Sequence, residues 1–353
     1  MLFRLYVNSS LCRAQSGFAA GNLRQLTLSA FRARTSGFRN NTFTEQFSFK
    51  TRTHTGPTIR ERLLGPTTGK PFIYGTYAVA GASVAGIGLL CYYGLGMSKE
   101  ISALDRSTVW PDYVKSRLRQ TYGYLAGGVA LTAAAGYAGF QSPLVMSIAS
   151  RGSILAMFGW IAAVIGTSAL AHSIPYENTF AKHVSWMLHC GVMGAMLAPL
   201  CALGGPVMIR AAWYTAGITA GLSATAICAP SEKFLFMAGP LSMGLAVVFA
   251  ANIGTFFFPP HSALGAGLIS VAIYGGLILF SAMLLYHTQR IMHLAEALPN
   301  SDYRTYYNQY GQPIQVRTGI YDPINAQMSL YADILNIFIR LVFILSGGGN
   351  RRK

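Results

Sequence analysis

Long apolar runs dominate the chain from residue 72 onward. Seven or eight of them reach the roughly 20 residues that a helix needs to cross a bilayer core, and they fall at about 72–96, 122–140, 153–172, 184–205, 207–228, 234–258, 263–286 and 324–345. The joints between most runs are too short for a soluble domain. The pattern predicts an all-α polytopic membrane protein with about eight spans, whose first span stands apart from the rest.

Two polar segments interrupt the runs. Residues 97–120 carry eight charged side chains, and Pro111 is suited to the first turn of a short helix. We expect that helix to lie along the membrane interface, anchored by Trp110 and nearby tyrosines. The second segment follows Tyr286 and contains four tyrosines between Pro299 and Pro313, so we expect an irregular exposed loop.

Composition agrees with a membrane protein. Hydrophobic residues make up 52% of the chain and charged residues 11%, about half the charged share of an ordinary soluble domain. Glycine is abundant and often spaced as small-xxx-small, as in Gly217 and Gly221, which lets membrane helices approach closely.

The net charge of +16 is concentrated in the N-terminal region. Residues 1–62 hold ten Lys or Arg and two acids, and the part before Glu45 has six arginines and no acid. An Arg-rich, hydroxyl-rich, acid-free start is typical of a mitochondrial presequence. The alternative is a basic cytosolic tail that binds anionic lipid; nucleic-acid binding is not expected, because no recognisable motif accompanies the arginines. With eight spans and a presequence, both ends of the chain would lie in the matrix.

Asp333 is the strongest candidate functional residue. It lies inside the apolar run 324–345, whereas the other ten carboxylates lie in the N-terminal region, between runs or at their ends. An ionisable group within a span costs about 2.5–3.5 kcal/mol on insertion scales and usually marks a functional site. The alternative is a structural acid that is hydrogen-bonded to a neighbouring helix.

A polar stripe accompanies this acid at steps of three and four residues, which place its members on one helical face: Asn325, Ser329, Asp333, Asn336 and Arg340. The opposite face is apolar and suits lipid or packed helices. We expect Arg340 either to extend toward the membrane surface or to pair with an acid on another helix.

Three further residues are candidates with simpler alternatives. His287 ends the preceding run and titrates near neutral pH, so it can relay protons or be an ordinary interfacial histidine. Asp322 precedes Pro323 and is well placed to cap the last helix. Glu232, in a tight joint, is either a residue of a capped helix start or a carboxylate at an ion entrance.

Motifs of soluble enzymes are absent from the sequence. There is no nucleophile elbow, P-loop, dinucleotide-binding fingerprint or HExxH. His172, His183 and His189 are spread over two helix ends and do not form a convincing metal site. We therefore expect neither an enzyme nor a resident cofactor.

Several longer segments carry a family resemblance. They are LCYYGLG (90–96), WPDYVK (110–115), RAAWYTAG (210–217), CAPSEKFL (228–235), YDPIN (321–325) and GGNR (348–351). From about residue 70 to the end, the chain resembles the transmembrane Bax-inhibitor-motif family. The resemblance implies seven family helices in residues 121–353, preceded by an extra helix at 72–96 within residues 63–120, in the mitochondrial inner membrane.

The resemblance also implies a function. It points to calcium–proton exchange, with roles in cristae organisation and in restraining cytochrome c release. In the family, two acids on the last two core helices form a proton-sensitive pair that gates a calcium path; Asp333 matches the second, but His287 stands where the first is expected. A histidine removes an oxygen ligand that calcium prefers and can introduce a positive charge.

We therefore expect a proton-sensitive cation transporter in which Asp333 is the gating carboxylate and possible calcium ligand, and His287 is its titrating partner. The competing expectation is a non-transporting scaffold that shapes cristae and binds inner-membrane proteases or respiratory proteins.

Overall fold

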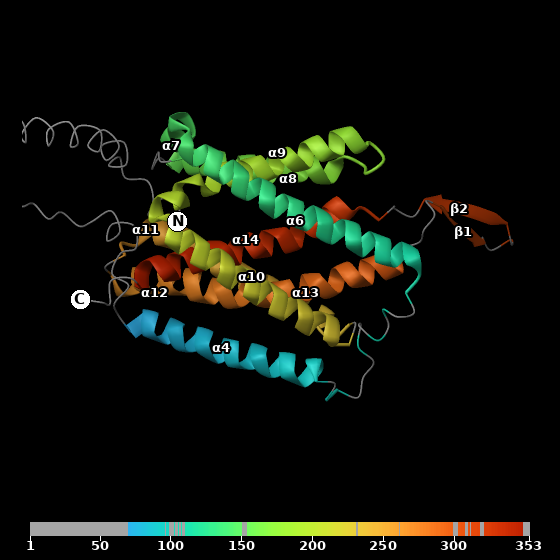
Figure 1. Cartoon of the computed structure of the whole chain (residues 1–353), viewed down its shortest axis with the longest axis horizontal. Coiled ribbons are helices and arrows are strands. Elements are labelled where there is room, and N and C mark those ends of the chain that lie inside the picture. The colour runs from blue at the N-terminus through green and yellow to red at the C-terminus, as the bar shows by residue number, and fades with distance from the viewer. Residues whose placement is uncertain are drawn as a thin grey trace, which may run out of the picture.

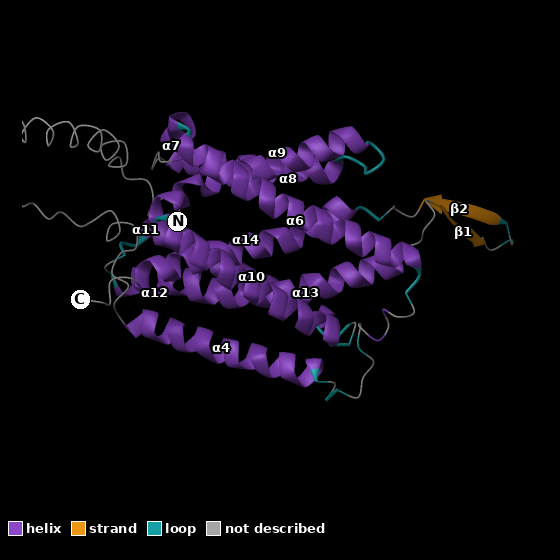
Figure 2. Ribbon diagram, in the orientation of Figure 1, coloured by secondary structure: helices purple, strands orange, loops and turns teal. Residues whose placement is uncertain are grey.

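The structure is a computed structural model. It describes residues 70–348 except 96, 99–101, 103–104, 106, 108–109, 150–153, 231, 261, 299–302, 308–309, 311 and 318–320. The predicted presequence and the basic C-terminal tail lie outside the described residues. Within the described part, the chain forms an elongated bundle of roughly aligned helices with one small β-hairpin projecting from an end (Figures 1 and 2).

Helices account for nearly all of the described secondary structure. They are α4 (Lys70–Gly94), α6 (Asp112–Gln141), α7 (Pro143–Ala149), α8 (Ile154–Ser173), α9 (Thr179–Leu197), α10 (Gly205–Cys228), α11 (Ala238–Phe257), α12 (Ala263–Ser270), α13 (Gly276–Ala297) and α14 (Pro323–Gly348). Two 3₁₀ turns, η1 (Ala198–Leu203) and η2 (Leu235–Met237), and a π-helical segment, η3 (Val271–Gly275), adjoin them.

Each predicted apolar run corresponds to a helix or to a joined set of helices. Five helical segments among the described residues are long and apolar enough to cross a membrane: Lys70–Gly94, Thr179–Leu203, Leu235–Phe257, Ala263–Ala297 and Pro323–Gly347. Phe158–Ser173 is a shorter apolar helix. α6 and α10 are as long but richer in Gly, Ala and Thr, which contribute little hydropathy. The expectation of an all-α polytopic membrane protein is confirmed.

Two local expectations were wrong. The helix expected to begin near Pro111 is not a separate interfacial one: from Asp112 the chain makes the first turns of α6, which runs unbroken to Gln141. The segment after α13 is not wholly irregular, because β1 (Tyr303–Tyr307) and β2 (Pro313–Arg317) pair antiparallel, with Tyr303 opposite Arg317. A period-two pattern with β-branched and aromatic residues accounts for the strands.

α14 is the central helix of the bundle. It contacts α13, α6 and α10, and its residues Leu330, Ile337 and Val342 are fully buried in the main hydrophobic core. The face opposite the polar stripe therefore packs against helices rather than lipid. The polar stripe faces the protein interior as well, since Asp333 and Arg340 are also buried.

Glycines allow α6 and α9 to pack closely. A Cβ on Gly194 of α9 would lie 2.6 Å from the Thr132 carbonyl oxygen and 2.8 Å from the Gly136 nitrogen, both in α6. Only a residue without a side chain fits between these backbones, as is common where membrane helices cross.

α4 is attached to the bundle along part of its length. Phe72 is buried and makes an edge-to-face contact with Tyr274 of η3, and the Ser270 hydroxyl donates to the Pro71 carbonyl oxygen at 2.7 Å. Further along, α4 lines a groove of about 540 Å³ with α10 and α13. It is a peripheral helix, as its separate position in the sequence predicts.

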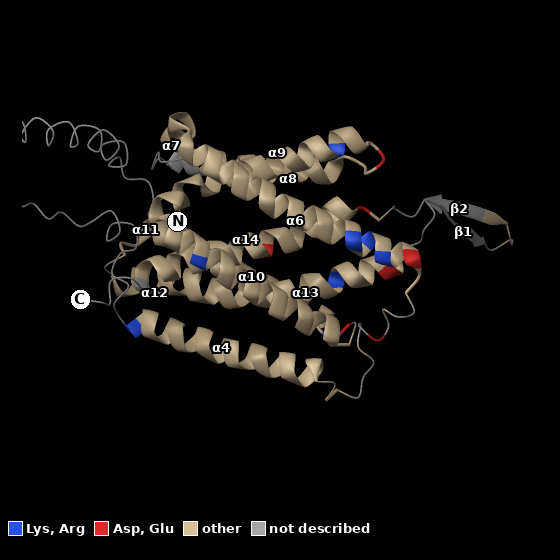
Figure 3. Cartoon of the chain, viewed as in Figure 1, with Lys and Arg blue, Asp and Glu red and all other residues tan. Residues whose placement is uncertain are grey.

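The two ends of the bundle differ in charge. The start of α4 and the end of α14 lie at one end (Figure 1), which agrees with an even number of crossings. Lys, Arg, Asp and Glu concentrate at the other end, where the hairpin emerges, and the middle of α14 shows one acid (Figure 3). That charged end contains the first turns of α6, the start of α9 and the end of α13.

Candidate functional site

Asp333 and His287 form a buried pair between α14 and α13. His287 Nδ1 lies 2.5 Å from Asp333 Oδ2, a distance at which a proton on the ring nitrogen is donated to the carboxylate. Asp333 is 1% exposed and His287 8% exposed. The structure therefore brings together the two residues that the sequence singled out, and their gating role stays a prediction.

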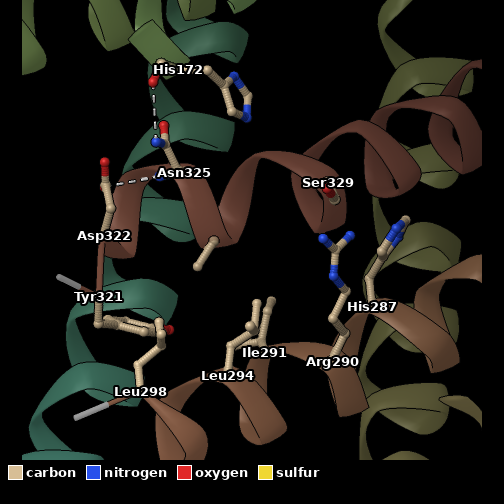
Figure 4. A pocket seen from close by; sticks show the side chains of 11 residues that line it. His172, His287, Arg290, Ile291, Leu294, Leu298, Tyr321, Asp322, Asn325 and Ser329 are labelled. Carbon is tan, nitrogen blue, oxygen red and sulfur yellow. Dashed lines mark hydrogen bonds between the residues drawn. The ribbon is translucent and has the colours of Figure 1, made fainter. Parts of the chain in front are cut away.

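A cavity of about 260 Å³ extends from the charged end of the bundle to His287, the member of the pair that lines it. His287 lies at its inner end beside Arg290 and Ser329, while Asp322, Asn325 and His172 line the other end (Figure 4). Leu294, Ile291 and Leu298 of α13 form an apolar wall between the two ends. The cavity gives water and small ions a route to the imidazole.

A lysine that sequence analysis overlooked holds the outer end of this cavity. Lys182 of α9 is fully buried, and its Nζ lies 2.6 Å from Asp322 Oδ2. The ammonium also donates to the carbonyl oxygens of Ala171 and Ile174 and to Asn325 Oδ1, at 2.7 to 3.0 Å. Four oxygen acceptors around one ammonium join the α8–α9 turn to the start of α14.

Asp322 has two structural tasks. Its Oδ1 accepts hydrogen bonds from the backbone nitrogens of Ile324 and Asn325, at 2.9 and 3.1 Å, which caps α14 in the way predicted. Because its other oxygen binds Lys182, the carboxylate is occupied by the protein and offers little to an ion.

The next residue back, Tyr321, anchors the same end to α6. Its hydroxyl shares a 2.8 Å hydrogen bond with Thr121, and the Arg117 guanidinium lies 5.3 Å from the ring centroid. Burial raises the pKa of the Tyr321 hydroxyl, so it stays protonated and available for this bond. Arg117 also donates to the carbonyl oxygens of Ala295 and Leu298, which fixes the end of α13 against α6.

The rest of the polar stripe continues beyond the pair. Arg340 Nη1 donates to both the backbone and the side-chain oxygen of Asn336, each at 2.9 Å, and the guanidinium lies 4.4 Å from the Phe280 ring centroid. Arg340 is 5% exposed, so it does not extend to the surface. Within the described part of the chain it also has no carboxylate partner, so both expectations for it were wrong.

Glu232 lies away from the cavity. Its side chain is 75% exposed and lies 4.0 Å from His293 Nε2. The helix start next to Glu232 is capped by Gln289 of α13, whose Oε1 accepts from the Phe234 nitrogen at 2.7 Å. The Gln289 amide also donates to the carbonyl oxygens of Ala226 and Pro230.

Lys182 and Gln289 were missed for identifiable reasons. Lys182 falls at the edge of an apolar run, next to His183, where a lysine is ordinarily solvated. Gln289 is polar but uncharged, and its partners lie 55 to 63 residues away.

The ligand set does not resemble a resident metal site. Among the described residues, no group of three or more His, Cys, Asp or Glu is placed to hold a metal ion. The pair offers one carboxylate and one imidazole, whereas calcium takes six to eight oxygens. The arrangement can exchange a proton with the cavity and can release or retain the Asp333 charge.

Comparisons with known proteins identify a family. Residues 114–351 match the family model Bax1-I, described as inhibitor of apoptosis-promoting Bax1. The chain is 48% identical over 317 residues to the growth hormone-inducible transmembrane protein of Rattus norvegicus, covering 87% of each chain. It is 23% identical over 276 residues to Bax inhibitor 1 of Oryza sativa subsp. japonica, covering 77% of this chain and 92% of the relative.

An uncharacterised protein of Pseudomonas aeruginosa is 29% identical over 245 residues, which are 67% of this chain and 91% of that protein. No solved structure matches the chain significantly. The helical bundle, the match over 114–351 and the similarity to the rat protein lead to one conclusion: this multi-pass membrane protein belongs to the Bax-inhibitor family.

Proposed function

We propose that this chain is a proton-sensitive cation transporter of the mitochondrial inner membrane, which exchanges calcium for protons, and that it is not an enzyme. The observation that carries the proposal is the buried His287–Asp333 pair, whose imidazole lines a cavity that opens toward the charged end of the bundle. Proton-coupled transport requires a buried acid that can exchange a proton for another counter-charge.

The pair acts as a gate through its shared proton. While His287 is protonated, the imidazolium neutralises Asp333 and holds α13 against α14. Loss of that proton leaves a buried carboxylate without a counter-charge, which is unfavourable unless a cation or a second proton replaces it. Raising the pH in the cavity therefore favours exchange of the proton for a cation.

Other charged and titratable groups around the pair modulate this exchange. Arg290 lines the same cavity and adds a positive charge to it, and His172 lies at the cavity's other end. The Lys182–Asp322 pair at the outer end is internally neutral, and Arg340 lies two turns along α14. The surroundings therefore disfavour cation entry while the histidines are protonated.

Calcium in this proposal is a transported substrate, held briefly. One carboxylate and the nearby Ser329 hydroxyl supply too few ligands for tight binding, and the ion would keep several waters. Weak binding suits transport, because a cation that binds tightly does not leave.

The mitochondrial location rests on the Arg-rich start of the chain and on the family resemblance. Both termini would lie in the matrix, so the cavity, at the end opposite the C-terminus of α14, would open toward the intermembrane space. Roles in cristae organisation and in restraint of apoptosis accompany this proposal, the latter suggested by the name of the family model.

Calcium flux into proteoliposomes under an imposed pH gradient tests the proposal. We expect wild-type flux to follow the gradient and Asp333→Asn to abolish it, because asparagine cannot carry the exchanged charge. His287→Asp should increase flux, since a second carboxylate adds oxygen ligands and removes the imidazolium. Asp105→Asn is a matched control: this acid bonds to Ser102 outside the helix bundle and should transport as wild type does.

The proposal fails if wild-type and Asp333→Asn proteins pass calcium equally or if flux ignores the gradient. No flux in wild type with robust flux in His287→Asp would favour a second candidate, a non-transporting scaffold for cristae, inner-membrane proteases, cytochrome c or respiratory proteins. The single carboxylate at the site favours that scaffold.

A further inference from the structure

Arg340 lies in the same α13–α14 contact as the His287–Asp333 pair. It follows Asp333 by seven residues, two helical turns or about 10 Å along α14. Its neighbour on α13, Phe280, precedes His287 by the same seven residues. The two antiparallel helices thus bring an acid and a histidine together at one level, and an arginine and an aromatic ring together at the next.

The structure builds a fitted site for this guanidinium. Its Nη1 hydrogen bonds to Asn336 and its position over the Phe280 ring fix two sides. On a third side, a Cβ at Gly276 would collide with Arg340 Nε, so only glycine leaves room. The π-helical segment η3 ends at Gly275, directly before this glycine, and such segments frequently occur at functional sites.

The charge of this guanidinium is uncompensated in the described part of the chain. Its Nε is buried and has no hydrogen-bond partner, and no described carboxylate pairs with it. A buried cation is ordinarily paired with an acid, because desolvation otherwise makes it unfavourable. A neutral side chain would fill this space with a smaller desolvation penalty, so the presence of a charge here indicates a function for it.

We infer that Arg340 is a second barrier to cations, in series with the His287–Asp333 gate; the inference rests on the proposed transport function. The opposite face of α14 is apolar: Leu330 and Leu335 line a largely apolar cavity with α6 and α10, and Val342 is buried. The charged side chain that follows Asp333 on α14, Arg340, lies along the contact with α13. A cation released from Asp333 toward the C-terminal end must pass the guanidinium. Because repulsion scales with ionic charge, Arg340 excludes divalent cations more strongly than monovalent ones and does not exclude anions.

The experiment removes the two barriers in turn. Full-length His287→Asp and His287→Asp/Arg340→Gln proteins are reconstituted, and entry of calcium, potassium and chloride is measured at equal pH on both sides. We expect the double variant to pass calcium at least about tenfold faster than His287→Asp, with a smaller rise for potassium and no rise for chloride, in accord with the dependence on ionic charge.

Matched variants separate charge from packing. Arg340→Lys on the His287→Asp background keeps the charge and should retain most of the barrier. Arg210→Gln removes an exposed arginine from α10 and should leave entry unchanged. Gly276→Ala keeps Arg340 but displaces its guanidinium; it should also speed calcium entry, and it serves if the glutamine variant does not fold.

Equal rises for calcium, potassium and chloride would overturn the inference, because they would show a leak left by lost packing. Unchanged calcium entry in the double variant and in Gly276→Ala would also overturn it. The proposed function is judged separately, by whether the wild-type protein passes calcium under a pH gradient and loses that flux in Asp333→Asn. If it does while Arg340 has no effect, the gate stands and the second barrier does not.

Discussion

α14 and α4 are both long enough and apolar enough to cross a membrane, but they differ in what surrounds them. In the most apolar stretch of α14, 67% of residues are buried inside the protein, whereas in that of α4 none are. Hydropathy alone gives the two helices the same description. Their places in the bundle, one central and one peripheral (Figure 1), separate them.

Their polar side chains differ in the same way. In α4, the hydroxyls of Thr76 and Ser83 bond to carbonyl oxygens four residues earlier in the same helix, so α4 satisfies itself and can face lipid. In α14, Asp333 and Tyr331 bond to residues of other helices. A polar residue that bonds to another helix is therefore a better indication of a functional helix than hydropathy is.

The largest expected effect comes from Lys182→Met. The substitution keeps an unbranched side chain but leaves Asp322 and Asn325 without their cation at the start of α14. Breaking a buried ion pair by removing one partner costs about 3–5 kcal/mol. We expect a clear fall in the thermal unfolding midpoint of the purified protein in detergent.

Lys70→Met is the control for this prediction. Lys70 is exposed at the start of α4, and its loss should change stability by less than about 0.5 kcal/mol. Equal midpoints for the two variants would contradict the view that the start of α14 is held by an ion pair while α4 is not.

How much of this contrast the sequence reveals depends on the residue. Asp333 could be found, because a single acid in a long apolar run departs from its surroundings. The expected pairing with His287 came from a family pattern, and the structure brings the two within 2.5 Å. His287 lies on α13 and Asp333 on α14. These helices follow each other in the chain and pack as antiparallel neighbours.

The remaining contacts depend on tertiary structure that the pattern does not contain. Lys182 finds Asn325 across 143 residues, and nothing local marks either as the other's partner. The same holds for Arg340, whose neighbours Phe280 and Gly276 lie about 60 residues earlier in the chain, on α13. The β-hairpin was missed because its flanking prolines and glycine suggested a loop.

Replacing a glycine with alanine should change stability by an intermediate amount in the bundle and very little in α4. Gly194→Ala places a methyl group 2.6 Å from a backbone oxygen of α6, so the α6–α9 crossing must open, at a cost of about 1–3 kcal/mol. Gly81→Ala in α4 has nothing within 4 Å and should be neutral or slightly stabilising. Thermal unfolding in detergent checks both, and a destabilised Gly81→Ala would mean that α4 is packed more tightly than the structure shows.

The smallest effect tests single hydroxyl groups. Tyr331 of α14 is 1% exposed, and its hydroxyl shares a 2.5 Å hydrogen bond with Thr132 of α6. Tyr331→Phe leaves the Thr132 hydroxyl buried with only a longer, 3.4 Å contact to the Cys190 carbonyl oxygen, which should cost about 1 kcal/mol. Tyr77→Phe changes a 69% exposed ring in α4 and should cost nothing measurable. Because the two substitutions remove the same atom from helices of similar hydropathy, a difference in unfolding midpoint reports only what lies around each helix, and equal midpoints would remove the distinction between a central α14 and a peripheral α4.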